Sequence, residues 1–176
     1  MAFPNKSKRD YVLLALDKYE RHLTRYAARM LGGDVDRAAD VVQFAFMKLC
    51  EQDSAKQDSQ LKAWLYTVCR NRVIDLIRKN SRVSSMEPAV MDLSAGMFDN
   101  PQLDAERREW LSVLHERISR MSDQDREIID LWSHGFKHRE IAEITGKKSS
   151  TVRVQLHRSI QSLKRELGVE SVKESH

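Results

Sequence analysis

Residues 138–158, HREIAEITGKKSSTVRVQLHR, carry the most specific structural pattern in this chain. Apolar residues recur at three- and four-residue spacings on both sides of Gly146, a pattern typical of two short amphipathic helices joined by a sharp turn. Ala142 is small enough to let the two helices approach closely. The pattern predicts a helix-turn-helix with helices over about 138–145 and 150–167 and with a small core formed by Ile141, Ala142, Ile144, Val152 and Leu156.

The second helix of such a motif enters the major groove of duplex DNA. Hydroxyl groups at its start would donate to phosphates, and the side chains that follow would project toward bases or backbone. The predicted contacts are Ser149, Ser150, Thr151, Arg153, Val154, Gln155, His157 and Arg158. Because Gln pairs with adenine and an apolar group suits the thymine methyl, we expect Val154 and Gln155 to favour A·T pairs and Gln155→Arg to change that preference.

The other patterned segments are helical as well. Helical spacing covers about 103–118, and a further helix over 123–133 begins at a Ser122 cap and ends at Gly135. Near the N-terminus the pattern predicts a helix over 11–31 ended by Gly32 and Gly33, a second from an Asp34 cap to about Cys50, and a third over 61–79 after a polar loop, 51–60. No strand pattern of useful length occurs, so the predicted fold class is all-α.

An acidic segment separates two groups of helices. Residues 83–106 contain five acidic residues, no Lys or Arg, and two of the three prolines. Charge of one sign and low hydrophobicity disfavour a packed structure. We therefore predict two small helical domains, 1–82 and 104–176, joined by a flexible acidic linker over 83–103.

Basic residues gather on one helix of each domain. The chain has 176 residues and a net charge of only +4, but 62–82 holds six basic residues against one acid, and 147–165 holds six against none. Lys and Arg that neutralise phosphates are the main sequence-independent source of affinity for nucleic acid. Two such clusters in separate domains favour a nucleic-acid partner over an ordinary solvated surface.

Length and composition exclude several classes of protein. The length excludes a large multi-domain enzyme. No run approaches the ~18 apolar residues of a membrane span, and no apolar region follows the basic N-terminus as in a secretion signal. Cys50 and Cys69 lie in apolar helical stripes and are expected to be reduced core cysteines of a cytoplasmic protein that does not insert into a membrane.

A small metal-dependent enzyme is the weaker alternative. His134 and His138 stand four residues apart, but Gly135 breaks the helix between them, and Glu140 is the one nearby acid that could complete a ligand set. The sequence shows no nucleophile–base arrangement and no Gly-rich phosphate loop. We expect no metal, no cofactor and no enzymatic activity.

Three segments resemble one protein family. Residues 120–164, RMSDQDREIIDLWSHGFKHREIAEITGKKSSTVRVQLHRSIQSLK, resemble domain 4 of bacterial sigma-70-family RNA polymerase sigma factors of the extracytoplasmic-function (ECF) group. DRAADVVQFAFMKL (36–49) resembles the polymerase-binding helix of domain 2, and LKAWLYTVCRNRVIDLIRKN (61–80) resembles its promoter-melting helix. The resemblance covers about 10–80 and 105–165, in the family's order and spacing.

The resemblance implies a factor that binds core RNA polymerase and directs promoter-specific transcription initiation. Domain 4 would bind the minus-thirty-five element and the polymerase β flap, and an anti-sigma factor is a further expected partner. Domain 2 would dock on the β′ clamp helices through Asp40, Gln43, Phe44 and Met47. It would open the minus-ten element with Lys62, Tyr66, Arg70, Asn71, Arg78 and Lys79.

Two aromatic residues of the melting helix receive different predictions. At 100° per residue Trp64 falls on the main apolar stripe, whereas Tyr66 falls outside it. We expect Trp64 in the core and regard Tyr66 as the better candidate to stack on an unpaired base. Opening a promoter costs about 1.4 kcal/mol per stacked base-pair step, and because the sequence shows no ATP site, binding energy must supply it.

The chain also departs from the family pattern. Ala39 and Phe44 stand where acidic residues are usual, and Lys147 stands after Gly146 where an aliphatic residue is expected. Lys148 takes the customary place of a Ser cap, so we expect the cap to shift to Ser149.

A free-standing helix-turn-helix regulator, with an N-terminal dimerisation module, remains the alternative. It explains 120–165 equally well but leaves the basic segment 62–82 without a role. The role of the acidic linker also stays open between a plain tether and a mimic of nucleic acid.

Overall fold

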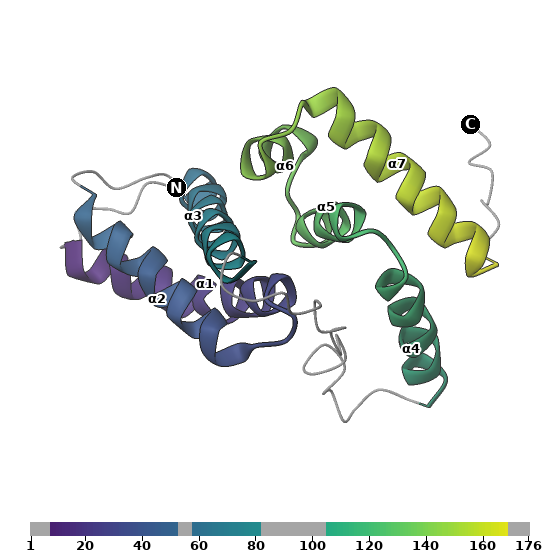
Figure 1. The fold of residues 1–176 in the computed structure, drawn as a ribbon, viewed down its shortest axis with the longest axis horizontal. Helices are drawn as coiled ribbons and strands as arrows, with labels where there is room; N and C mark the ends of the chain where they lie inside the picture. The colour runs from purple at the N-terminus through teal and green to yellow at the C-terminus, as the bar shows by residue number, and fades with distance from the viewer. Residues whose placement is uncertain (1–7, 53–57, 82–104, 169–176) are drawn as a thin grey trace. The chain divides into compact units, whose positions relative to one another are not determined.

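The computed structural model describes residues 8–52, 58–81 and 105–168. Over these residues the chain forms helices and no strand, which confirms the all-α prediction (Figure 1). The chain divides into two compact units, Met1–Asp92 and Leu93–His176. The predicted acidic linker, 83–103, lies outside the described residues. The helices are α1 (Lys8–Met30), α2 (Val35–Glu51), α3 (Asp58–Ser81), α4 (Ala105–Ser119), α5 (Asp123–Ser133), α6 (His138–Thr145) and α7 (Ser149–Glu166).

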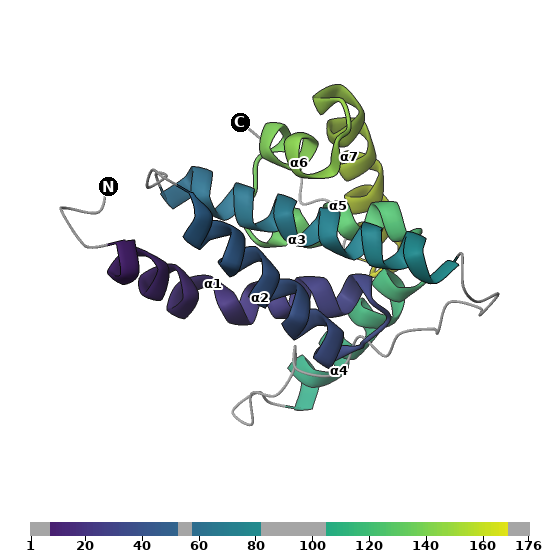
Figure 2. The ribbon, with the colours of Figure 1, turned by 60° about the vertical axis from the view of Figure 1, so that its left-hand side comes forward.

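In the first unit α1, α2 and α3 pack against one another, with α1 and α2 side by side (Figure 2). The turn between α1 and α2 forms as the sequence predicts. Gly32 and Gly33 adopt φ values of 70° and 89°, in the left-handed region that only glycine adopts readily. Asp34 then caps α2, where its carboxylate accepts a hydrogen bond from the Arg37 amide at 2.9 Å.

Each helix of the first unit contributes a stripe of buried side chains to a common core. On α3 four of the buried residues are spaced four apart, and Tyr66 joins them; the four are Leu61, Leu65, Cys69 and Val73. Burial raises the pKa of the Cys69 thiol to about 12. The prediction for Cys50 is wrong, because that side chain is exposed.

Helix α3 begins earlier than predicted. Residues 58–60 were predicted to lie in a loop because they are polar, but they form the first turn of α3. The Asp58 carboxylate accepts hydrogen bonds from the Tyr19 hydroxyl at 2.6 Å and from the Lys18 ammonium at 2.5 Å. An acid in the first turn also complements the helix dipole. This contact with α1 fixes the start of α3, and the sequence alone does not show it.

In the second unit α7 packs against α4, α5 and α6. Ser122 caps α5 as predicted, accepting from the Asp125 amide at 3.2 Å. Gly146 ends α6 in the left-handed conformation, with φ 69°. All five predicted core residues of the helix-turn-helix are buried, and Ile128, Leu131 and Phe136 complete their core.

The start of α7 differs from the prediction in one detail. Ser149 is the first helical residue and not the cap. Lys148 holds the cap position in extended conformation without a side-chain cap bond. The hydroxyl-bearing residues of the first turn, Ser149, Ser150 and Thr151, are exposed. Within the described ranges, no helix combines the length and the apolar character that crossing a membrane requires.

Candidate nucleic-acid interface

The outward face of α7 collects nearly all the residues predicted to contact DNA. Val152, Leu156 and Ser159 turn inward and are buried. Seven of the eight predicted residues are exposed, and Gln155 is half-buried; the seven are Ser149, Ser150, Thr151, Arg153, Val154, His157 and Arg158. This face combines hydroxyl donors, two guanidinium groups and one apolar side chain, the 44% exposed Val154. That combination can contact phosphates and base edges.

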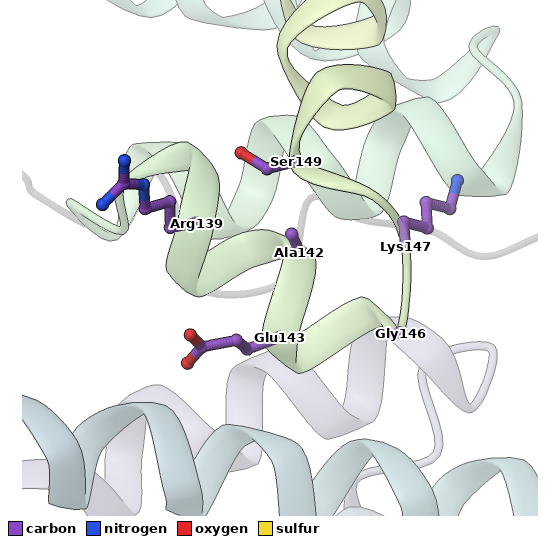
Figure 3. Close-up of a pocket in the computed structure, with 6 residues that line it drawn as sticks. All are labelled: Arg139, Ala142, Glu143, Gly146, Lys147 and Ser149. Carbon is purple, nitrogen blue, oxygen red and sulfur yellow. The ribbon is translucent and has the colours of Figure 1, made fainter.

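The turn before α7 places a lysine beside this face. A shallow hollow at the turn is lined by Arg139, Ala142, Glu143, Gly146, Lys147 and Ser149 (Figure 3). Lys147 Nζ donates hydrogen bonds to Gln155 Oε1 at 3.1 Å and to Gln124 Oε1 at 2.9 Å. Sequence reasoning missed this contact, because the three residues share no helical period.

The two histidines considered for metal binding have separate surroundings. His134 Nδ1 lies 2.7 Å from the backbone carbonyl oxygen of Asp130 and 3.4 Å from its Oδ1. His138 is exposed at the start of α6. Glu140 accepts a hydrogen bond from the Lys137 amide at 2.7 Å and so stabilises the start of α6. Among the residues that the structure describes, no group of three or more His, Cys, Asp or Glu side chains is placed to hold a metal ion.

The outward face of α2 carries the residues predicted to bind polymerase. Asp40, Gln43, Phe44 and Met47 follow i, i+3, i+4, i+7 spacing and lie on one side of the helix. Asp40, Gln43 and Met47 are exposed, and Met47 is 57% exposed despite its apolar side chain. A single exposed apolar side chain is common on protein surfaces, so what this face offers a partner is the combination of Met47 and the half-buried Phe44 with the polar Asp40 and Gln43.

Phe44 is half-buried because two cations pack on its ring. The Arg72 guanidinium carbon lies 4.8 Å from the ring centroid, and Lys48 Nζ lies 5.7 Å from it. Both distances are within the ~6 Å range of a cation–π contact. The ring also lines a hollow of about 230 Å³ between α2 and α3, together with Lys48, Trp64, Val68, Asn71, Arg72 and Asp75. Phe44 therefore connects α2 to α3 through Arg72.

The residues predicted to act at the minus-ten element do not share one face of α3. Asn71 and Arg78 are exposed and, seven residues apart, lie on the same side. Lys79 is exposed on a different side, and Lys62 and Arg70 are half-buried. The structure gathers only Asn71 and Arg78 into a common surface.

The prediction for Tyr66 is wrong. Its side chain has no exposed area, and its ring packs against Tyr26 with centroids 5.0 Å apart and an interplanar angle of 47°. Trp64 is instead only half-buried and reaches the hollow beside Asn71. A tyrosine in the core of three helices cannot stack on a base in this conformation. Trp64 is the aromatic residue of α3 that solvent reaches.

Family models match both units of the chain. The model described as Sigma-70 region 2 matches residues 15–83, which include α2 and α3. The model described as Sigma-70, region 4 matches residues 111–163, which include α5, α6 and most of α7. Together the two matches cover more than half of the chain.

Individual relatives match most of the chain. The RNA polymerase sigma factor SigV of Bacillus subtilis is 29% identical over 139 residues, or 78% of this chain and 80% of that protein. The ECF RNA polymerase sigma factor SigL of Mycobacterium tuberculosis is 29% identical over 163 residues, or 87% of this chain and 88% of that protein.

Among solved structures, the chain is similar to the sigma factor RpoE of Bartonella quintana, which was crystallised in complex with the anti-sigma factor NepR. The TM-score is 0.67 at 27% identity, and the match covers 90% of this chain and 97% of the other. Both sigma regions thus occur in order on one chain, which is similar to ECF sigma factors in sequence and to a sigma factor in structure. The chain belongs to the ECF group of the sigma-70 family of RNA polymerase sigma factors.

Proposed function

We propose that this sigma factor binds core RNA polymerase and directs promoter-specific initiation by recognising the minus-ten and minus-thirty-five elements. One observation carries the proposal: regions 2 and 4 both match the chain, in order, over two separate helical units. The corresponding domains are residues 1–82 and 104–176, joined by the acidic linker 83–103.

The minus-thirty-five element is assigned to the outward face of α7. The first-turn hydroxyls of Ser149, Ser150 and Thr151 are exposed at the positive end of the helix dipole, where a phosphate is favoured. Further along, Arg153, Val154, Gln155, His157 and Arg158 would face base edges or backbone.

The minus-ten element is assigned to α3. Asn71 and Arg78 form its central surface, with Lys79 toward the end of the helix and Lys62 and Arg70 at the border. Basic side chains would hold the single-stranded backbone, while the Asn71 amide can read a base edge. The half-buried Trp64 replaces Tyr66 as the aromatic residue closest to this surface.

Polymerase is assigned to the outward face of α2. Asp40, Gln43, Phe44 and Met47 would contact the β′ clamp helices, and the outer helices of the second unit would contact the β flap. Arg72 of α3 packs on the Phe44 ring, as does Lys48 of α2. A protein that docks on α2 at Phe44 would therefore also affect the position of Arg72 on α3.

Two further properties follow as proposals. The Bartonella quintana relative was solved with an anti-sigma factor, and we propose that a protein of that kind restrains this chain. The chain would act in the cytoplasm through binding energy, without catalysis of its own.

The free-standing regulator is not favoured. It would use the helix-turn-helix alone, whereas the region 2 match spans residues 15–83 and includes the helices assigned to polymerase and to the minus-ten element.

Association with polymerase tests the proposal. The full chain is mixed with core RNA polymerase and passed through a sizing column, and the collected complex is then tested for retention of a promoter duplex. We expect the chain to co-elute with the polymerase and the complex to retain specific duplexes. Binding of duplex DNA by the chain without any association with polymerase would support the regulator instead.

A further inference from the structure

A lysine in the turn bonds to a side chain of the recognition helix. The Lys147 ammonium donates to Gln155 Oε1 at 3.1 Å and to Gln124 Oε1 at 2.9 Å. Figure 3 shows the Lys147 side chain leaving the turn on the side away from Arg139 and Glu143. Lys147 and Gln155 are half-buried, so water only partly competes for their bond.

This bond fixes the direction in which the Gln155 amide points. An ammonium group has three donors and no acceptor, so the amide oxygen and not the amide nitrogen must face it. The Nε2 group, with its two hydrogens, then points away from Lys147. Lys147 thus engages the acceptor that a glutamine uses for the N6 amino group of adenine.

Gln155 lies where a recognition helix reads bases. It follows Thr151 by four residues and precedes Arg158 by three, so the three residues form one strip of α7. Thr151 and Arg158 are both exposed, and the strip borders the outward face that carries Val154. In the proposed docking geometry, the amide nitrogen of Gln155 is its hydrogen-bonding group toward the groove.

We propose that Lys147 is a specificity-determining residue that makes Gln155 select guanine over adenine. Guanine presents two acceptors in the major groove, N7 and O6, whereas adenine presents the acceptor N7 and the donor N6. A donor-only amide suits guanine, and the nearby ammonium charge attracts O6 and repels the N6 amino hydrogens. This inference rests on the proposed function and reverses, at this one position, the A·T preference that the sequence predicts.

A selection experiment tests the proposal. The full chain, bound to core RNA polymerase, selects from duplex promoters randomised across the upstream element, and the recovered duplexes are sequenced. Gln155→Ala identifies the base pair read by Gln155 as the one where preference is lost. At that pair the natural chain should enrich guanine, and Lys147→Met should move the guanine-to-adenine ratio about tenfold toward adenine.

Matched variants separate specificity from charge. Lys148→Met removes the same charge from the adjacent, exposed residue, whose side chain makes no bond to Gln155 in the described structure. It should weaken binding to all sequences and leave the ratio unchanged. Lys147→Arg keeps a donor-only cation and should keep the preference for guanine. Lys147→Leu provides a second apolar replacement if the methionine variant does not fold.

Three results would overturn the proposal. Lys147→Met could lower enrichment evenly, as Lys148→Met does, which would make Lys147 a phosphate contact. Gln155→Ala could leave every position unchanged, or the natural chain could prefer adenine at the pair that Gln155 reads.

The same library is also offered to the chain without polymerase. Enrichment there, but not with polymerase, contradicts the proposed function and still reports the guanine-to-adenine ratio. Lack of enrichment in both arms contradicts the function and the inference together.

Discussion

At the scale of single residues, Tyr66 is a packing residue of the first unit. Tyr66→Ala would remove a fully buried ring that contacts Tyr26, and we expect a loss of about 3 kcal/mol in the free energy of unfolding. Tyr66→Phe keeps the ring and should leave promoter opening at its natural rate. Urea unfolding measures the stability of Tyr66→Ala. The reactivity of unpaired thymines in the open complex measures promoter opening by Tyr66→Phe. Loss of opening in a well-folded Tyr66→Phe variant would restore a direct role at the DNA.

Asp58 gives the first unit a dependence on pH. Hydrogen bonds from Lys18 and then from Tyr19 lower the pKa of the Asp58 carboxyl from its usual 3.8. A lowered folded-state pKa means that this stabilisation is complete above the unfolded-state pKa and disappears as the pH falls through the folded-state value. Asp58→Asn should therefore cost about 1 kcal/mol at pH 7, since the ion pair is partly exposed, and should flatten this part of the acid response.

The measurement for Asp58 uses the fluorescence of Trp64. Replacing Trp110 and Trp132 by Phe leaves this single tryptophan, which lies in the first unit. Urea unfolding is then compared at pH 7 and at pH 3 for the natural residue and for Asp58→Asn. Equal stability of the two proteins at pH 7 would show that the bonds of Asp58 to Lys18 and Tyr19 do not stabilise the first unit.

At the scale of elements, Gly146 sets the angle between α6 and α7. Its φ of 69° disfavours any residue with a Cβ, although a Cβ there would meet no atom within 4 Å. The cost of Gly146→Ala is therefore a backbone cost of about 1–2 kcal/mol. Gly146→Asn should cost less, because Asn tolerates the left-handed region. Thermal unfolding of the two variants gives the order, and equal melting temperatures would contradict this explanation.

The ends of most helices were predictable from the sequence because local chemistry decides them. Gly33, Asp34, Ser122 and Gly146 act through their own backbone or nearest amides, and each forms the predicted turn or cap. The start of α3 was not predictable, because it depends on a contact between Asp58 and residues of α1 about forty positions earlier. Tertiary contacts of this kind override local polarity.

The same distinction between local and tertiary contacts explains which parts of the candidate site were predictable from the sequence. The outward face of α7 follows from helical period alone, and the structure confirms the two residues predicted for its buried side, Val152 and Leu156, and adds Ser159. Tyr66 was misplaced because α3 packs against two helices, which widens its buried face beyond one stripe. The bonds of Lys147 join a turn and two helices, and no periodicity indicates such a contact.

At the scale of the whole molecule, different helices are proposed to bind different partners, and polymerase binding by α2 is the role most easily separated from DNA binding. Met47→Glu places a charge on the face assigned to polymerase, at a residue that is 57% exposed, so folding should change by less than about 0.5 kcal/mol. We expect at least a tenfold loss of affinity for core polymerase, measured by fluorescence anisotropy of labelled chain.

Leu13→Glu is the matched control for this prediction. Leu13 is 50% exposed on α1, outside the face assigned to polymerase, and the substitution adds the same charge. It should leave the affinity for polymerase unchanged. Equal losses from the two variants would mean that overall charge, and not the α2 surface, determines binding.

We infer that this one chain of 176 residues carries surfaces that recognise both promoter elements and brings those surfaces to core RNA polymerase. The most direct measurement is run-off transcription by core RNA polymerase on a selected promoter, with the full chain added or omitted. We predict a transcript of defined start that requires the full chain and both promoter elements, and that Arg158→Ala and Asn71→Ala each reduce. If no defined transcript forms on promoters that the chain itself selects, or if the transcript persists when either element is scrambled, the chain does not act as proposed.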